Sequence, residues 1–256
     1  MPRPFSASPV DVELLQGSAG ADPALDVALP HALVDLVAEG RHRPVLRAYR
    51  PAPTMAFGRR DTFLPGFAGA VAVARRHGFT PVIRGAGGRA AAYDHGCLIF
   101  DEVMPADGSG IRERFADDAR RQAEVLRSLG VDARVGEVAG EYCPGEFSVN
   151  ARGRVKLIGA AERIVRGAWL HSSVVVVEGA AGLRAVLEDV YSTLGLDWDP
   201  GTVGDVSAES PGVDVEAVRA AFIAQYAERY RLTPTAIGEP ELARAGELLD
   251  RHRVET

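Results

Sequence analysis

The stretch from Gly136 to Ala161 reads GEVAGEYCPGEFSVNARGRVKLIGAA, and it predicts a loop followed by a β-hairpin. Apolar and polar residues alternate over 147–149, and apolar residues predominate again over 155–158, which is typical of two short strands. Residues 150–153 between them are Asn-Ala-Arg-Gly, and both Asn and Gly tolerate the positive φ that a tight turn requires. We therefore expect two paired strands after an irregular segment.

Two residues of this stretch are candidates for chemistry. Cys143 belongs to a Tyr-Cys-Pro-Gly turn, so it is expected on a loop, where reactive groups tend to sit. Lys156, 13 residues later on the returning strand, is the single lysine among the 29 Lys and Arg residues. The arginine bias indicates GC-rich coding, which favours Arg wherever Arg serves. A lysine kept at one position therefore indicates a need for a compact, flexible ammonium.

Length and composition are those of one globular domain. The chain has 256 residues, of which 46% are hydrophobic and 25% charged, and this length buries a sizeable core. The net charge of −6 argues against general nucleic-acid binding. The first ten residues lack the apolar centre of a signal peptide, and no apolar run reaches the ~18 residues of a membrane span. We therefore expect a cytoplasmic protein with no nucleic-acid or membrane partner.

The two cysteines predict neither a disulfide framework nor a metal site, because they form no Cys-x-x-Cys pattern. Cys97 opens the apolar run Cys-Leu-Ile-Phe-Asp over 97–101, so it is expected to be a small buried residue of a strand. Cys143 is left as the candidate nucleophile.

A glycine-rich segment over 84–90, Arg-Gly-Ala-Gly-Gly-Arg-Ala, is a second candidate for ligand binding. Glycines let the backbone approach a ligand closely and turn its N–H groups toward it. The segment lacks both the Gly-Lys-Ser/Thr of a Walker loop and the full Gly-x-Gly-x-x-Gly of a dinucleotide site.

Taken together, these motifs resemble those of the biotin/lipoate A/B protein ligase family, with the likeness extending over residues 20–235. That family moves lipoyl, octanoyl or biotinyl groups onto lysines of carrier domains. Lys156-Leu157-Ile158-Gly159 is similar to its Lys-(Ile/Leu)-x-Gly motif, 84–90 to its Arg-x-x-Gly-Gly-(Gly/Arg)-Ala motif, and 58–62 to its Gly-Arg-x-(Gln/Asp)-(Asn/Thr) motif. The Tyr-Cys-Pro-Gly turn is most similar to the cysteine-dependent octanoyltransferases of the amidotransferase type.

The resemblance implies an acyltransferase of protein lipoylation. Cys143 would form an octanoyl (or lipoyl) thioester, and Lys156 would stabilise the substrate oxyanion and favour the thiolate. The implied partners are lipoyl carrier domains, namely the glycine cleavage H protein and the E2 subunits of 2-oxoacid dehydrogenases. No cofactor and no metal are implied. The residues implied to bind substrate are Gly58, Arg59, Arg84, Gly87, Gly88, Arg89, Ala90, Tyr93, Gly159, Ala160 and His171.

Three alternatives stay open at this point. The first is an ATP-dependent lipoate-protein ligase, which would use ATP and Mg; ligases usually carry a C-terminal accessory domain, and the residues after Tyr230 are too few to form one. The second is a transferase that takes octanoate from acyl carrier protein. The third is a non-catalytic binder of lipoyl domains, against which the pair of Cys143 and Lys156 argues.

The fold implied by the resemblance is α+β, a mixed, mostly antiparallel sheet flanked by helices, like the biotinyl/lipoyl protein ligase catalytic domain. Residues 1–20 are expected to form a flexible arm, and 21–256 a single catalytic domain with C-terminal helices.

Asp22-Pro23 predicts a helix start, with Asp26 as a solvated charge and Pro30 as a kink. The acyl chain is expected against Phe57, Val82, Ile83 and Phe147. Strands are expected over 45–49, 54–57, 81–84, 97–101 and 169–177, and helices over 65–77, 111–129, 180–194, 215–231 and 239–251.

Overall fold

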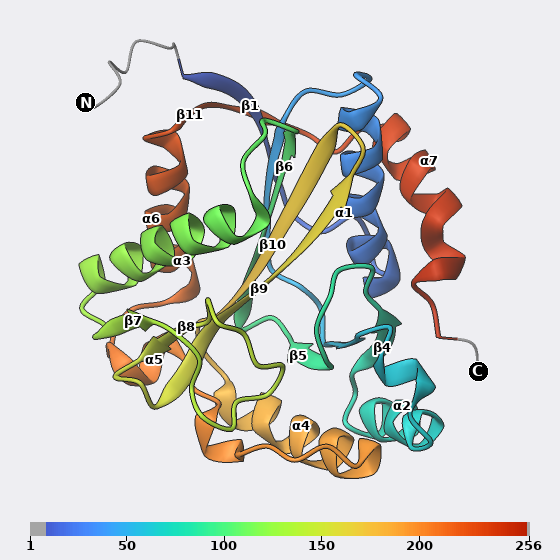
Figure 1. Ribbon diagram of the computed structural model, residues 1–256, viewed down its shortest axis with the longest axis vertical. Helices are drawn as coiled ribbons and strands as arrows, with labels where there is room; N and C mark the ends of the chain where they lie inside the picture. The colour runs from blue at the N-terminus through green and yellow to red at the C-terminus, as the bar shows by residue number, and fades with distance from the viewer. Residues whose placement is uncertain (1–8, 255–256) are drawn as a thin grey trace.

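A large, mostly antiparallel sheet forms the centre of the molecule, in a computed structural model that describes residues 9–254 (Figure 1). The strand order is β11-β1-β2-β6-β10-β9-β8-β7, in which β1 pairs in parallel with β2 and with β11, and the other pairs are antiparallel. The predicted α+β class is therefore confirmed. The strands are β1 (Val10–Gln16), β2 (Val45–Tyr49), β6 (Cys97–Pro105), β7 (Ala133–Val135), β8 (Val149–Ala151), β9 (Val155–Val165), β10 (Ala168–Val176) and β11 (Tyr230–Thr235).

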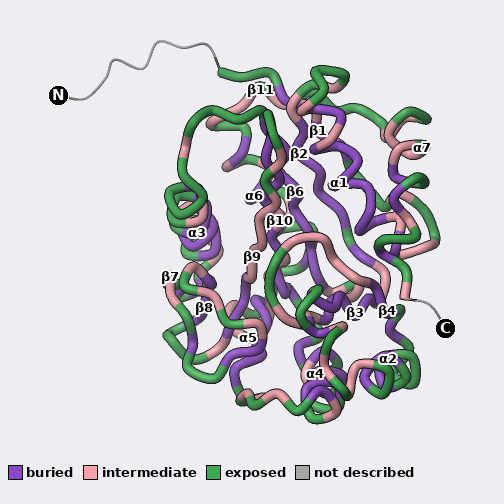
Figure 2. The backbone as a smooth tube through the Cα atoms, turned by 45° about the vertical axis from the view of Figure 1, so that its right-hand side comes forward, coloured by how far each residue is buried: buried purple, intermediate pink, exposed green. Residues whose placement is uncertain are grey.

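Helices cover both faces of this sheet. On one face α1 (Pro23–Ala38) packs against β6 and β10, and α7 (Glu239–Leu248) packs on α1. On the other face lie α3 (Ile111–Ser128) and α6 (Val215–Ala227). Because both faces are covered, the central strand β6 is buried from Cys97 to Met104, and Figure 2 shows that α1 and β2 are buried along most of their length.

A second sheet of three strands lies beside the large one and carries part of the site. It consists of β3 (Thr54–Phe57), β4 (Thr80–Ile83) and β5 (Ala91–Tyr93), with β3 central. Helices α2 (Phe67–Arg76) and α4 (Ala180–Leu194) pack together against it. The glycine-rich segment connects β4 to β5, and the Cys143 loop connects β7 to β8. The two loops therefore come from different sheets.

Helix α1 begins as its sequence predicts, with Asp22 accepting a hydrogen bond from the Ala24 N–H and a proline at the first helical position. The helix runs through Pro30 to Ala38. The expectation that Asp26 is solvated is wrong, because this carboxylate is buried and forms an ion pair with the buried Arg47. A buried charge requires such a partner, which lies on β2 and is invisible to local sequence patterns.

Two predictions at the edge of the sheet are corrected. Residues 10–16 of the expected flexible arm form β1, since they add a parallel strand between β2 and β11; residues 1–8 of that arm lie outside the described part of the chain. The helix expected over 215–231 ends at Ala227, because residues 230–235 pair with β1 as β11. Within residues 9–254, no helix has the length and apolarity needed to cross a bilayer.

Most remaining elements lie where they are expected. The strands over 45–49 and 54–57 and the helix over 180–194 agree at both ends, and the hairpin joins β8 to β9. The polar connection over 201–212 contains the short helix α5 (Val206–Glu209), which Asp205 caps through a bond from the Ala208 N–H.

Candidate active site

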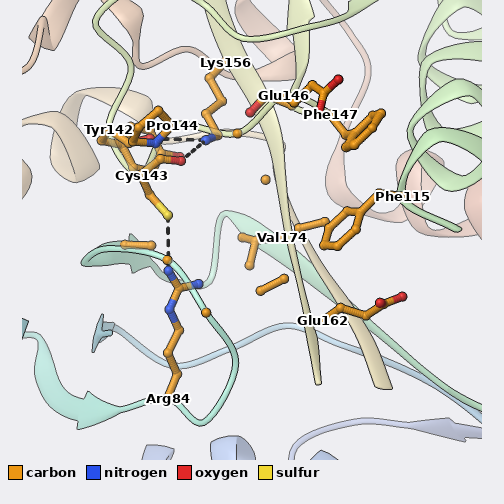
Figure 3. A pocket seen from close by; sticks show the side chains of 18 of the residues that line it. Arg84, Phe115, Tyr142, Cys143, Pro144, Glu146, Phe147, Lys156, Glu162 and Val174 are labelled. Atoms are coloured by element: carbon orange, nitrogen blue, oxygen red, sulfur yellow. Dashed lines mark hydrogen bonds between the residues drawn. The ribbon is translucent and has the colours of Figure 1, made fainter. Parts of the chain in front are cut away.

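Cys143 lies where the two loops meet, with its sulfur facing the glycine-rich segment (Figure 3). Its Sγ accepts a hydrogen bond from the backbone N–H of Arg89 and one from Nη2 of Arg84, both at 3.2 Å. Burial alone would raise the pKa of the thiol. The charges of Arg84 and Lys156 and the two hydrogen bonds outweigh burial, so the pKa lies below its ordinary value. The arrangement therefore favours a thiolate.

Gly88 makes this contact possible. A Cβ at this residue would lie 2.7 Å from Cys143 Sγ and 2.4 Å from Arg84 Nη2, and the φ of Gly88 is +104°. Any side chain here would push the sulfur away from its donors. The Arg84 guanidinium also donates to the carbonyl of Arg89 at 2.5 Å, so it folds the glycine-rich turn around the sulfur.

The backbone of Cys143 is held in an unusual conformation, with φ at +42°. Its N–H donates to the hydroxyl of Tyr191 at 2.9 Å, and that hydroxyl donates to the carbonyl of Ala90 at 2.8 Å. One side chain of α4 therefore ties the cysteine loop to the glycine-rich segment. Tyr191 could not be predicted from the sequence, because 48 residues separate it from Cys143 and no motif surrounds it.

Lys156 holds the cysteine loop through three hydrogen bonds. Its Nζ donates to Oε1 of Glu141 at 2.9 Å and to the carbonyls of Tyr142 at 3.2 Å and Cys143 at 2.8 Å. These three acceptors match the three protons of an ammonium group, and the residue is 3% exposed. In this arrangement Lys156 contacts the loop, and its predicted contact with a substrate carbonyl stays a prediction.

Glu141 is a second residue that the sequence analysis missed. Its buried carboxylate accepts hydrogen bonds from the Lys156 ammonium, the Ser148 hydroxyl, and the N–H groups of Gly145 and Val138. The carboxylate therefore closes the loop from 138 to 148 on itself. The sequence did hold a signal for this ion pair, namely an acidic residue two positions before the cysteine and a single lysine that could pair with it.

The segment after β3 contacts the glycine-rich turn and supports it. Buried Asp61 accepts hydrogen bonds from the Gly58 N–H at 2.9 Å and from Nη1 of Arg89 at 3.1 Å. Gly58 packs directly on Gly88, since a Cβ at Gly58 would lie 1.9 Å from the Gly88 carbonyl oxygen. These contacts hold Gly58 and the Arg89 side chain against Asp61, while the Arg89 N–H binds the sulfur.

Beside Cys143 lies a cavity of about 640 Å³, within the usual size range of small-molecule sites. Figure 3 shows Cys143 and Arg84 on one side, with Phe115, Phe147 and Glu162 across from them. The rings of Phe115 and Phe147 stack with centroids 5.9 Å apart. The remaining apolar lining comes from both sheets and α3, namely Ala91, Ala92, Ile111, Ala160, Ala161, Ile164 and Val174. An acyl chain is the kind of group that such walls accept.

The structure brings part of the predicted set together. Of the predicted site residues, those that line the cavity are Arg84, Gly87, Gly88, Cys143, Lys156, Gly159 and Ala160. Arg59 is exposed to solvent, and Tyr93 lines an adjoining small cavity of about 70 Å³ that shares Arg84, Gly159 and Ala160 with the first.

Three expected walls of the acyl site are wrong. Phe57 and Val82 lie in the core of the small sheet, and Ile83 pairs with the backbone of His252. Of the four residues expected there, only Phe147 lines the cavity, because the small sheet contributes Ala91 and Ala92 of β5 to its wall and no residue of β3 or β4.

Two more residues are buried away from the cavity. His171 lies 3.7 Å from carboxylate oxygens of Asp118 and Glu162 and does not line the cavity. Burial opposes its charged form, but Glu162 and Asp118 raise the pKa of its imidazole. Cys97 is fully buried, as predicted, and burial raises the pKa of its thiol to about 12. Among residues 9–254, no three His, Cys, Asp or Glu side chains gather in a way that could hold a metal ion.

The sequence of the chain is similar to that of known proteins. Residues 22–227 match the family model of the lipoyl protein ligase A/B catalytic domain. The octanoyl-GcvH:protein N-octanoyltransferase of Geobacillus kaustophilus is 30% identical over 170 residues, which are 66% of this chain and 60% of that enzyme. The chain thus spans about three fifths of the length of this curated relative.

Ligases are similar as well. Lipoate-protein ligase A subunit 1 of Thermoplasma acidophilum is 30% identical over 183 residues, or 69% of this chain and 70% of that subunit. A crystal structure of lipoate-protein ligase A bound with ATP superimposes with a TM-score of 0.75 at 26% identity, covering 95% of both chains. From the match over 22–227, which contains both loops and the cavity between them, the chain belongs to the lipoyl protein ligase A/B catalytic domain family.

Proposed function

We propose that the protein transfers an octanoyl (or lipoyl) group, through a thioester on Cys143, to the target lysine of a lipoyl carrier domain. The observation that carries this proposal is the environment of Cys143 Sγ. A thiol of lowered pKa, held by Arg84 and the Arg89 N–H, faces an apolar cavity. A nucleophile with this activation forms acyl intermediates readily.

In the first step the Cys143 thiolate attacks the carbonyl carbon of an octanoyl-lysine amide. A carbon–sulfur bond forms, the carbon–nitrogen bond breaks, and the leaving amine takes up the proton that the thiol released. In the second step the neutral amine of the acceptor lysine attacks the thioester, loses a proton, and expels the thiolate. One amide is exchanged for another, so the overall reaction requires neither ATP nor metal.

The tetrahedral intermediate carries its negative charge on an oxygen two bonds from the sulfur. The donors that hold the thiolate, the Arg84 guanidinium and the Arg89 N–H, are therefore placed to stabilise that charge as it moves from sulfur to oxygen. Lys156 adds a positive charge and fixes the carbonyl of Cys143. Positioned donors of this kind act without reorganising during the reaction.

The octanoylated H protein is the proposed donor, and E2 lipoyl domains are the proposed acceptors. Support comes from the relative named octanoyl-GcvH:protein N-octanoyltransferase and from the Tyr-Cys-Pro-Gly turn. Acyl carrier protein is the alternative donor, since exchange between two thioesters is the easier reaction.

An ATP-dependent ligase is the rival function, and the similarity to lipoate-protein ligase A over nearly the whole chain favours it. A ligase activates a free acid as an adenylate, so it gives the thiol no part in the reaction. Four separate features would then be unexplained: the two donors on Sγ, the positive φ of Cys143, and the glycine that admits the sulfur.

Intact-protein mass spectrometry without ATP tests the proposal. The protein is mixed with octanoylated H protein or with octanoyl-acyl carrier protein, and the mass of an octanoyl adduct is sought. A hydroxylamine-labile adduct from the H protein, absent in Cys143→Ala, is expected. An adduct from acyl carrier protein alone would change the donor. Octanoylation of a lipoyl domain only with octanoate and ATP would replace the proposal by the ligase.

A further inference from the structure

A positively charged and aromatic patch lies on the surface next to the glycine-rich turn. After β3 the chain enters a short 3₁₀ turn, Asp61–Phe63, and presents Arg59, Arg60 and Phe63 to solvent. Phe63 is 85% exposed, the most exposed of the large apolar residues in the described chain. We call these three residues the Arg59–Phe63 patch.

The patch is tied to Cys143 by a short series of contacts. Asp61, between the two arginines and Phe63, binds the Gly58 N–H and the Arg89 guanidinium. Gly58 packs on the carbonyl of Gly88, and Gly88 packs on Cys143 Sγ. The patch therefore has a fixed position beside the rim of the cavity, where Gly87 and Gly88 are exposed.

The charge of the patch is not balanced within the described residues. Asp61 is paired with Arg89, and neither Arg59 nor Arg60 forms an ion pair with any residue of 9–254. Two free positive charges thus stand together on a chain whose net charge is −6. Arginine and aromatic side chains are enriched where proteins bind one another, and free charges at a rim steer partners of opposite charge.

We propose that the Arg59–Phe63 patch is the docking surface for the carrier domain, and that it recognises an acidic face with an apolar contact beside the carrier's lysine. The proposal rests on the proposed function. A lysine that reaches Cys143 Sγ brings its own domain surface against the rim formed by Gly87 and Gly88. The neighbouring patch would then lie under that surface. A small acyl donor needs no such contact.

The test compares binding with chemistry. Arg59→Glu with Arg60→Glu, and separately Phe63→Ala, are compared with Arg75→Glu plus Arg76→Glu on α2, where two exposed arginines undergo the same change of charge. The dissociation constant for H protein and for an E2 lipoyl domain is measured by calorimetry in a Cys143→Ser background, so that no turnover is required. Acylation of Cys143 by octanoyl-N-acetylcysteamine is measured in the native background.

The patch variants should bind carriers about tenfold more weakly, and for the arginine variant the difference should shrink at about 0.5 M salt, while the α2 variant binds nearly as well as the parent. Acylation by the small donor should be unchanged in Phe63→Ala and in the α2 variant. Equal weakening by patch and α2 variants, or no weakening by either, would overturn the docking surface. Failure of the parent protein to form an adduct would overturn the proposed function instead, because carrier binding is measured separately.

Discussion

The Tyr191 hydroxyl accepts a hydrogen bond from the backbone N–H of Cys143 at 2.9 Å, and this contact joins α4 to the cysteine loop. The same hydroxyl donates to Ala90 of the glycine-rich segment. The relative position of the sulfur and its donors thus depends on a phenol from a third element.

Tyr191→Phe tests that dependence. The variant keeps the ring and leaves the Cys143 N–H and the Ala90 carbonyl without their partner, so stability should fall by about 1–2 kcal/mol. Turnover should fall about tenfold, since small misplacement of a reacting group slows reactions strongly. Tyr226→Phe, in the core beside Phe100, is the control and should lose no turnover. An equal loss in both would mean that Tyr191 only stabilises the fold.

Cys143→Ala should abolish transfer and leave the unfolding temperature nearly unchanged, because the side chain is small and lies at a cavity wall. Cys97→Ala removes the same atom from the buried core. It should retain transfer while the free energy of unfolding falls by about 1 kcal/mol. Turnover by Cys143→Ala, followed with a purified lipoyl domain, would refute the thioester.

Lys156→Met should leave Glu141 charged and unpaired in the interior, with a loss of about 3–5 kcal/mol in stability. Adding Glu141→Gln removes the stranded charge and should recover much of that loss. It should not restore activity, because the positive charge near the sulfur is still missing. Denaturant unfolding and transfer rates, measured on both variants, separate the two roles of Lys156.

The lowered pKa of Cys143 predicts a pH profile. Alkylation by iodoacetamide follows the thiolate, so its midpoint should lie below that of an ordinary cysteine. Arg84→Met removes the largest of the influences that lower this pKa, so the midpoint should move upward. Arg50→Met, at an exposed residue that binds the His95 carbonyl, should leave the midpoint in place.

The same shift has a consequence for stability. Because the folded pKa is depressed, this thiol stabilises the fold above its unfolded pKa, and the contribution disappears as the pH falls through the folded pKa. The free energy of unfolding of the parent should therefore decline over that window relative to Cys143→Ala. Parallel curves for the two proteins would contradict the lowered pKa.

Sequence patterns predicted the elements whose signals are local. The proline and capping aspartate mark the start of α1. The hairpin of β8 and β9 forms as predicted, but its turn lies over 152–154, because Asn150 and Ala151 pair with β9 as part of β8. The family resemblance assigned Arg84, Gly88 and Cys143 to one site, and these three residues do contact one another.

Contacts between distant segments were not predictable in this way. Strands β1 and β11 stabilise each other at a sheet edge, although 220 residues separate Val10 from Tyr230. Tyr191 and Glu141 act through single hydrogen bonds that no periodicity reveals. Arg59 belongs to a motif of which Gly58 and Asp61 contact the glycine-rich turn, yet its own side chain is exposed to solvent.

The hydrogen bonds of Lys156 have one more consequence for the proposed transfer of acyl groups to amines. Apart from the amino terminus, the chain contains a single primary amine, and that amine is a buried ammonium with three acceptors. A protonated, enclosed amine does not attack a carbonyl. An acyl group on Cys143 would therefore meet no competing lysine on its own protein, and self-acylation would not drain the intermediate before a carrier arrives.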